Sequence, residues 1–211
     1  MSHLKLFVAA MFGLSVVGVA QEDRKQPFPG QEEKKHPEQQ QPGKDQKGMP
    51  SFQPSKEHLS LKQFDGEWEF TSKCTMPGQE AMDGKGTENV RMTYGGFWAD
   101  VESKGVMGGK DWSGRGLIGF DPQKKKYCGA WVDSMTPYMY TFEGEADTGG
   151  KVFTFMMKGV DPKTNKESTD RMVWEFKDQD HRTMKFFAKD ESGKETQVSE
   201  VTYTRKPAMV K

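Results

Sequence analysis

The feature that most constrains the fold of this sequence is a series of ten segments in which apolar and polar residues alternate. The segments are rich in aromatic and β-branched residues, and glycine, proline, asparagine and aspartate separate them. Alternation with a period of two is typical of strands that bury one face of a sheet. The predicted strands span residues 67–75, 86–94, 97–105, 112–120, 126–135, 138–145, 151–158, 168–177, 182–189 and 196–205.

The positions of the prolines agree with this assignment. Four of the five prolines after residue 56 lie between predicted strands, and the fifth, Pro207, follows the last strand. A proline inside a central strand would remove a ladder hydrogen bond, so prolines are confined to turns and edges. The glycine-rich stretch 108–116 is interpreted as a long hairpin turn, because it matches no phosphate-binding loop and no helix follows it.

Ten consecutive antiparallel strands must either stack as a sandwich or close as a barrel. Short turns throughout favour a meander, and closure removes the exposed edges of the sheet. We therefore expect an all-β fold, an antiparallel meander of about ten strands closed into a barrel, with room inside for a small ligand. Residues 57–64 predict a short helix that caps the barrel ahead of its first strand.

The residues before the barrel divide into two segments. Residues 1–20 place Lys5 before an uncharged apolar run that ends with the small residues Gly18 and Ala20, a pattern typical of a secretory signal peptide. An uncleaved N-terminal anchor is the alternative. Residues 21–56 hold six of the eleven prolines and eight glutamines among mixed charges, which predicts a disordered Pro/Gln/Lys-rich tether. Residues 57–207 form the one predicted domain, and we expect the protein to be exported, periplasmic or secreted.

Charge and cysteine content exclude several classes of protein. The chain carries 31 basic and 31 acidic residues, and a barrel without a basic excess gives no support to nucleic-acid binding. No membrane span is expected after signal cleavage, and the oligomeric state stays open. Two cysteines cannot build a disulfide framework or a four-cysteine zinc site. Cys74 and Cys128 fall on the predicted first and fifth strands, which favours free thiols over the disulfide that an exported protein could form.

Metal and cofactor sites are not expected. The sequence contains no His-x-His or Cys-x-x-Cys spacing, and no predicted strand contains a histidine that could bind haem. His181 follows Asp178 and Asp180 in a turn that we interpret as solvent-exposed. We therefore predict no metal and no cofactor.

The start of the first strand carries a resemblance to a known fold. Gly66-Glu67-Trp68, directly after the short helix, resembles the Gly-x-Trp start of lipocalins and related calycin barrels. The resemblance implies that Trp68 plugs the closed end of the barrel. It also implies that a basic residue on the last strand, here Arg205, packs over this tryptophan.

A closer resemblance covers nearly all of residues 57–207. Its motifs occur in order along the chain: Gly86-Thr87-Glu88, Gly95-Gly96-Phe97-Trp98, Gly119-Phe120-Asp121, Trp131-Val132-Asp133-Ser134-Met135 and Asp180-His181-Arg182-Thr183. The sequence is similar to the bacterial domain-of-unknown-function family 1579 (DUF1579). The resemblance implies an exported lipocalin-like β-barrel, and it supplies no established activity.

The stretch from Trp131 to Met135 is the most informative about a site. On a strand, Trp131 and Asp133 point to the same side. A carboxylate inside a barrel needs a partner, because an unpaired buried charge is costly, and Arg91 or Arg171 could provide it. Asp133 would then anchor a ligand in a pocket. The alternative is that Asp133 caps the turn at Thr136-Pro137.

The sequence therefore predicts a barrel that binds a small, partly apolar molecule. One alternative is a hydrolase or isomerase that uses Asp133, and a second is a structural envelope protein that acts through its tether. Glu88, Asp100 and Glu102 could do acid–base work if they were buried close together, but they are interpreted as exposed strand charges. The residues predicted to line the cavity are Trp131, Asp133, Tyr138, Tyr140, Arg91 and Trp174.

Overall fold

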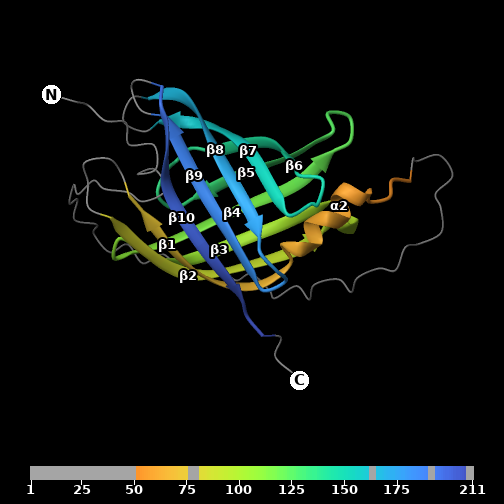
Figure 1. Cartoon of the computed structure of the whole chain (residues 1–211), viewed down its shortest axis with the longest axis horizontal. Coiled ribbons are helices and arrows are strands. Elements are labelled where there is room, and N and C mark those ends of the chain that lie inside the picture. Colours follow the sequence, from red (N-terminus) through yellow and green to blue (C-terminus); the bar gives the residue numbers. More distant parts are fainter. Residues whose placement is uncertain (1–50, 76–80, 162–164, 190–192, 208–211) are drawn as a thin grey trace, which may run out of the picture. The chain divides into compact units, whose positions relative to one another are not determined.

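The computed structural model describes residues 51–75, 81–161, 165–189 and 193–207, and within them ten strands form one closed antiparallel barrel (Figure 1). Each strand pairs with its neighbours along the chain, and β1 closes the barrel by pairing with β10. The strands are β1 (Gly66–Cys74), β2 (Met82–Thr93), β3 (Trp98–Met107), β4 (Lys110–Asp121), β5 (Lys126–Asp133), β6 (Tyr140–Ala146), β7 (Val152–Asp161), β8 (Lys166–Phe176), β9 (His181–Lys189) and β10 (Glu195–Arg205). The predicted ten-stranded meander and its closure are confirmed.

One predicted turn is wrong. Residues 108–116 do not form a long hairpin turn, because β3 runs to Met107 and β4 already begins at Lys110. Gly108 and Gly109 alone make the turn, with φ of 54° and 78°. Two adjacent residues at positive φ match the twist of a tight hairpin, and glycine adopts this conformation without strain.

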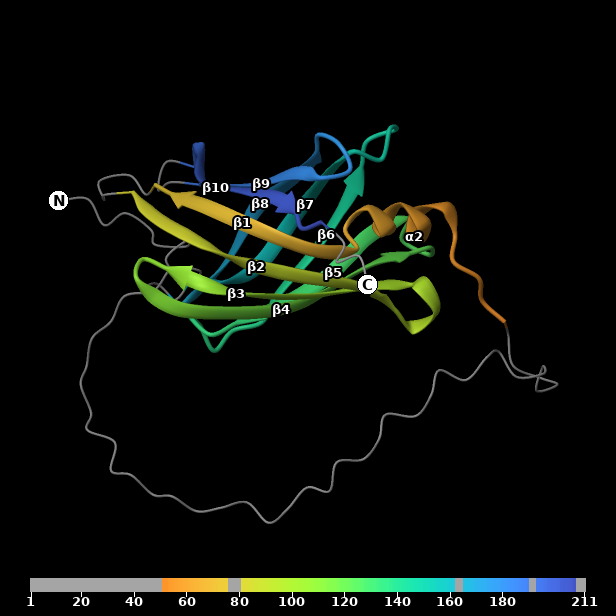
Figure 2. The same cartoon turned by 90° about the horizontal axis from the view of Figure 1, so that it is seen from below.

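A short helical segment lies at one end of the barrel, as predicted. It consists of α2 (Lys56–Ser60) and the 3-10 turn η1 (Leu61–Gln63), and Figure 2 shows α2 beside that end. Leu61 and Phe64 are fully buried. The hydroxyl groups of Ser60 and Tyr127 lie 2.8 Å apart, and Gln63 Nε2 donates a hydrogen bond to the carbonyl of Gly150. We call this end the closed end. A second 3-10 turn, η2 (Tyr94–Gly96), joins β2 to β3.

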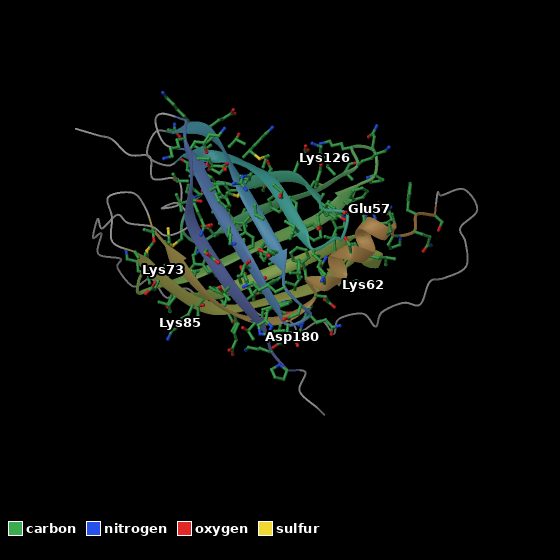
Figure 3. All side chains as sticks on the ribbon, viewed as in Figure 1. Glu57, Lys62, Lys73, Lys85, Lys126 and Asp180 are labelled. Carbon is green, nitrogen blue, oxygen red and sulfur yellow. The ribbon has the colours of Figure 1, made fainter. Side chains whose placement is uncertain are left out.

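The alternation predicted from the sequence sets the two faces of the barrel wall. On β1 the inward side chains, from Trp68 to Cys74, are buried, and the residues between them are exposed. Figure 3 shows charged side chains on the outer surface, among them Lys62, Lys73, Lys85, Lys126 and Asp180. The core is therefore the barrel lumen.

Inward-facing glycines let large rings lie close to the barrel wall. A Cβ atom on Gly114 would come within 2.2 Å of the Trp131 ring, and one on Gly129 within 2.3 Å of the Phe142 ring. Side chains at these glycines would push both rings toward the centre of the lumen. The glycines therefore help to keep space inside the barrel.

Both cysteines are free, as the sequence favoured. Cys74 lies on β1 and Cys128 on β5, so the predicted strand positions are confirmed. Burial raises the pKa of the Cys74 thiol to about 12. This thiol stays protonated at neutral pH and is a poor nucleophile, because the thiolate is the reactive form.

The predicted signal peptide (residues 1–20) and most of the predicted tether (residues 21–56) lie outside the described residues. Of the tether, residues 51–56 are described, and α2 begins at Lys56, one residue before the predicted start of the domain. Within the described part of the chain, no helix is long and apolar enough to cross a membrane.

Candidate functional site

The barrel encloses an apolar cavity of about 80 Å³. Side chains from most of the strands line it, and Phe64 contributes from the closed end. Its wall is rich in aromatic residues, which are characteristic of pockets for small molecules. The aromatic side chains that contribute most to the argument below are Phe70, Trp112, Trp131, Phe142, Trp174 and Tyr203.

Four methionines also line the cavity: Met107, Met157, Met172 and Met184. Pockets for drug-sized ligands usually measure about 300–1,000 Å³, so the cavity is small for such a molecule as it stands. Methionine is unbranched and flexible and adapts its shape at low cost. A larger ligand could therefore be admitted by rotation of these side chains.

A buried polar cluster lies in the wall of the cavity. Arg182 on β9 donates a hydrogen bond through Nη2 to Oε1 of Glu88 on β2. Ser103 on β3 donates to Oε2 of the same carboxylate at 2.7 Å. Arg182 is 0% exposed and Glu88 4% exposed. A buried ion pair needs such hydrogen bonds because both charges have lost their hydration. We call these three residues the Glu88 cluster.

Aromatic rings surround the guanidinium of Arg182. Its Cζ lies 4.1 Å from the ring centroid of Trp68, 4.6 Å from that of Tyr203 and 4.8 Å from that of Trp174. These cation–π contacts stabilise a charge that has no access to water. Arg205 lies 4.0 Å from the Trp68 ring, so it packs over this tryptophan as the lipocalin resemblance implied.

The environment of the Glu88 cluster shifts the pKa values of Arg182 and Tyr203. Burial lowers the pKa of Arg182, and the nearby Glu88 carboxylate opposes this shift. Burial, reinforced by Glu88, raises the pKa of Tyr203 well above its ordinary value. Arginine retains its proton in proteins, so the cluster holds a charged pair next to a neutral phenol.

Arg182 carries two buried N–H groups, on Nε and Nη1, that have no hydrogen-bond partner among the described residues. Three further unpartnered donors belong to residues that line the cavity. They are Nε1 of Trp112 on β4, Nε1 of Trp174 on β8 and Oγ of Ser199 on β10. Each of these residues is at most 9% exposed. A buried polar group without a partner costs about 1–3 kcal/mol, so three of them in one cavity require an explanation.

Two of the predicted cavity residues do line the cavity, Trp131 and Trp174. Trp131 stacks on Trp112 with their ring centroids 6.1 Å apart. Its indole N–H donates to Oδ2 of Asp133 at 3.2 Å, so unlike Trp112 and Trp174 it has an internal partner.

Asp133 ends β5 and caps the following turn, the alternative considered from the sequence. Its Oδ1 accepts hydrogen bonds from the backbone N–H groups of Met135 at 2.8 Å and Thr136 at 3.3 Å. Burial raises the pKa of this carboxyl, and the hydrogen bonds oppose the shift. Asp133 is not among the residues that line the cavity. Oδ1 is therefore occupied by the turn and Oδ2 by the indole N–H of Trp131.

The other three residues predicted to line the cavity lie outside its lining. Arg91 is exposed on the outer face of β2, in the opposite phase to the buried Val90. Tyr138 precedes β6, and its hydroxyl donates to Asn165 at 3.5 Å. Tyr140 is buried, but its hydroxyl lies 3.2 Å from that of Thr136, and its ring packs on Gly159 instead of lining the cavity. The proposed partner Arg171 binds Glu195 on the outer surface.

Sequence reasoning missed the Glu88 cluster. Glu88 was interpreted as an exposed strand charge, which is wrong, and Arg182 was placed at the start of a predicted strand without being assigned to the inner face. His181 is indeed exposed and lies 2.9 Å from Asp178, but β9 begins there and Arg182 points inward. The alternation along β9 could have revealed that Arg182 faces inward, because Arg182 shares a face with Met184 and Phe186, and both of these line the cavity.

No cluster of three or more histidine, cysteine, aspartate or glutamate side chains suited to a metal ion occurs in the described ranges.

A meander of ten strands closed into a barrel, with an internal cavity and a tryptophan at its closed end, defines a lipocalin-like β-barrel. Within this class the chain belongs to the family "Protein of unknown function (DUF1579)", whose model matches residues 53–205. The resemblance found in the sequence is thereby confirmed. The comparison with curated proteins gives no match.

Two solved structures show the same fold at low sequence identity. Rv2717c from M. tuberculosis is 11% identical, with a TM-score of 0.57, and the match covers 72% of this chain and 99% of that protein. The S-type phycobiliprotein lyase CPES from Guillardia theta is also 11% identical, with a TM-score of 0.50 and coverage of 74% and 99%. At this level of identity the similarity shows the fold alone.

Proposed function

We propose that this protein binds a small, partly apolar molecule inside the barrel. The observation that carries the proposal is the set of unpartnered donors on Trp112, Trp174 and Ser199 in an otherwise apolar cavity. A core that served stability alone would gain by replacing these groups with apolar ones, since unsatisfied buried donors are costly. A ligand that accepts hydrogen bonds would remove that cost.

Two further observations support binding. The inward glycines hold the Trp131 and Phe142 rings against the wall, and the four methionines allow the cavity to change shape. In the Glu88 cluster, Arg182 and Ser103 hold the two oxygens of the carboxylate, which gives one part of the cavity wall a fixed structure. A pocket with a defined wall and an adaptable remainder suits a small molecule of modest polarity.

Filling the cavity tests this proposal. We expect some members of a library of lipids, quinones and aromatic compounds to raise the melting temperature. At a ligand concentration of one hundred times Kd, binding adds about 2.7 kcal/mol to the free energy of unfolding. Val201 is buried and lines the cavity, so Val201→Phe should abolish the shift by occupying the space. Thermal denaturation with and without each compound is the measurement.

The neighbouring residue provides the control. Thr202 is exposed on the outer face of β10, so Thr202→Phe adds the same ring outside the barrel and should leave the ligand-induced shift unchanged. A library in which no compound raises the melting temperature contradicts the proposal. A shift that survives Val201→Phe but not Thr202→Phe would assign binding to the outer surface instead.

We also propose that the protein is exported from the cytoplasm. The uncharged apolar run that follows Lys5 and ends with Gly18 and Ala20 supports this. The mature protein is expected to begin at Gln21, and Ala20→Arg should block processing, because signal peptidases require a small residue at this position. Intact mass and N-terminal sequencing of protein from separated cell fractions would check this. Full-length protein in the cytoplasmic fraction alone would contradict it.

A further inference from the structure

We infer that the ligand of the cavity is an electrically neutral molecule that accepts hydrogen bonds at two or more separated points. This inference rests on the proposed binding function and specifies its ligand class. It follows from which polar groups in the cavity are already paired and which are not.

The unpaired groups require acceptors on the ligand. An indole N–H donates and cannot accept, so Trp112 and Trp174 can be satisfied only by an acceptor atom such as a carbonyl oxygen. The Ser199 hydroxyl, 2% exposed, also lacks an acceptor for its proton among the described residues. All three side chains line the same cavity and are at least nine-tenths buried.

The strand order separates these donors in space. Trp112 lies on β4 and Trp174 on β8, and three strands, β5, β6 and β7, stand between them on the shorter path around the barrel. Ser199 lies on β10, beyond β9 from Trp174. The two indoles therefore belong to different sides of the cavity wall, and a ligand with acceptors at two points can satisfy both. The methionines and Phe142 favour an apolar body between them.

The paired groups disfavour a charged ligand. Glu88 is the ionisable acid that lines the cavity, and Arg182 and Ser103 already occupy its two oxygens. A cationic ligand would therefore have to compete with Arg182. Arg182 has unpartnered N–H groups on Nε and Nη1, but Glu88 neutralises its charge and it is not among the residues that line the cavity. An anionic ligand would meet the neutral indole and hydroxyl donors of the lining without an uncompensated positive charge. Burying an ion without a counter-charge costs far more than burying a carbonyl group.

Three ring compounds of similar size separate these possibilities. 1,4-Diacetylbenzene carries two carbonyl acceptors at opposite ends, 1,4-diisopropylbenzene has the same shape without acceptors, and 4-isopropylbenzoate is an anion. We expect diacetylbenzene to bind at least as tightly as diisopropylbenzene although it is less hydrophobic, and isopropylbenzoate to bind most weakly. Titration calorimetry gives the affinities. In ¹⁵N-labelled protein, the indole N–H resonances of Trp112 and Trp174 should shift with diacetylbenzene and change much less with diisopropylbenzene.

Variants that lose the N–H donor but retain an aromatic ring test whether the affinity depends on the indole N–H groups. Trp112→Phe and Trp174→Phe should each weaken diacetylbenzene binding about fivefold, which is the usual contribution of one hydrogen bond, and leave diisopropylbenzene binding nearly unchanged. Ser199→Ala should act in the same direction. Trp98→Phe is the control, because Trp98 lies half-buried on the outer face of β3 and should affect neither compound.

The outcomes distinguish this inference from the function on which it rests. Binding of diisopropylbenzene with no binding of diacetylbenzene, or equal sensitivity of both to Trp112→Phe and Trp174→Phe, overturns the inference and leaves cavity binding intact. Tightest binding of isopropylbenzoate overturns the neutral ligand class. No binding by any of the three compounds counts against the cavity as a binding site and therefore against both proposals.

Discussion

Replacing Arg182 by methionine is expected to lower the free energy of unfolding by about 3–5 kcal/mol. The substitution removes the cation that neutralises Glu88 and leaves the carboxylate buried with only the hydroxyl of Ser103 as a donor. It also removes the cation–π contacts with Trp68 and Tyr203. Urea denaturation monitored by tryptophan fluorescence would give the change, provided that the m value is unaltered.

Two further variants define the origin of this loss. Glu88→Leu combined with Arg182→Met should recover much of it, because an apolar pair of similar volume often replaces a buried ion pair at little cost. Arg115→Met removes an exposed arginine whose guanidinium binds Asp100 on the outer wall, and it should have a small effect because water screens that pair. An Arg182→Met variant no less stable than Arg115→Met would contradict the importance of the buried pair.

The Glu88 cluster joins parts of the barrel that are not adjacent in the sheet. Its members lie on β2, β3 and β9, and β2 and β9 are separated by β1 and β10. The Glu88–Arg182 bond therefore joins two strands that are not paired with each other, on the inner side of the barrel wall. Such a bond helps to fix the position of β9 relative to β2. A functional benefit of this kind would explain why a charged pair occupies a place that apolar residues could fill.

The fold was predictable because its determinants are local. Apolar and polar residues alternate along each strand, and the turns use residues with the required backbone preferences, such as Gly108 and Gly109. Closure followed from short connections and from the cost of exposed edges. The capping helix and Trp68 were recognisable because Gly66 and Trp68 open the first strand directly after the helical segment.

The site was only partly predictable because its determinants are not local. On β2 the inward positions read Gly84, Gly86, Glu88 and Val90, so the alternation contains too few apolar residues to reveal that Glu88 faces inward. Its partner lies 94 residues away, and the pairing depends on closure of the barrel. Asp133 was predicted to line the cavity for a different reason, which concerns the position at which its strand ends. The predicted strand ran to residue 135, whereas β5 ends at Asp133, so its carboxylate meets backbone N–H groups of the turn.

Replacing Trp68 by alanine is expected to lower the free energy of unfolding by about 3–5 kcal/mol. Trp68 is 0% exposed, and its ring contacts the guanidinium groups of both Arg182 and Arg205. Its indole N–H donates to the carbonyl of Phe64 at 2.9 Å, which ties the barrel to the end of the capping segment. The substitution would leave a cavity between two cations and free that carbonyl.

The positions at which Trp68→Ala increases hydrogen exchange show whether Trp68 holds the closed end in place or stabilises the core as a whole. If Trp68 holds the capping segment against the barrel, Trp68→Ala should increase hydrogen exchange first at the amides of residues 59–65, whose backbone hydrogen bonds include Phe64 to Leu61 and Asp65 to Lys62. Trp68→Phe should show a smaller change, because it keeps an aromatic ring under Arg205 and loses the N–H group and only part of the buried volume. Trp98→Ala, on the outer face, controls for loss of an indole elsewhere. Equal loss of protection throughout the barrel would mean that Trp68 stabilises the whole core, with no special role at the closed end.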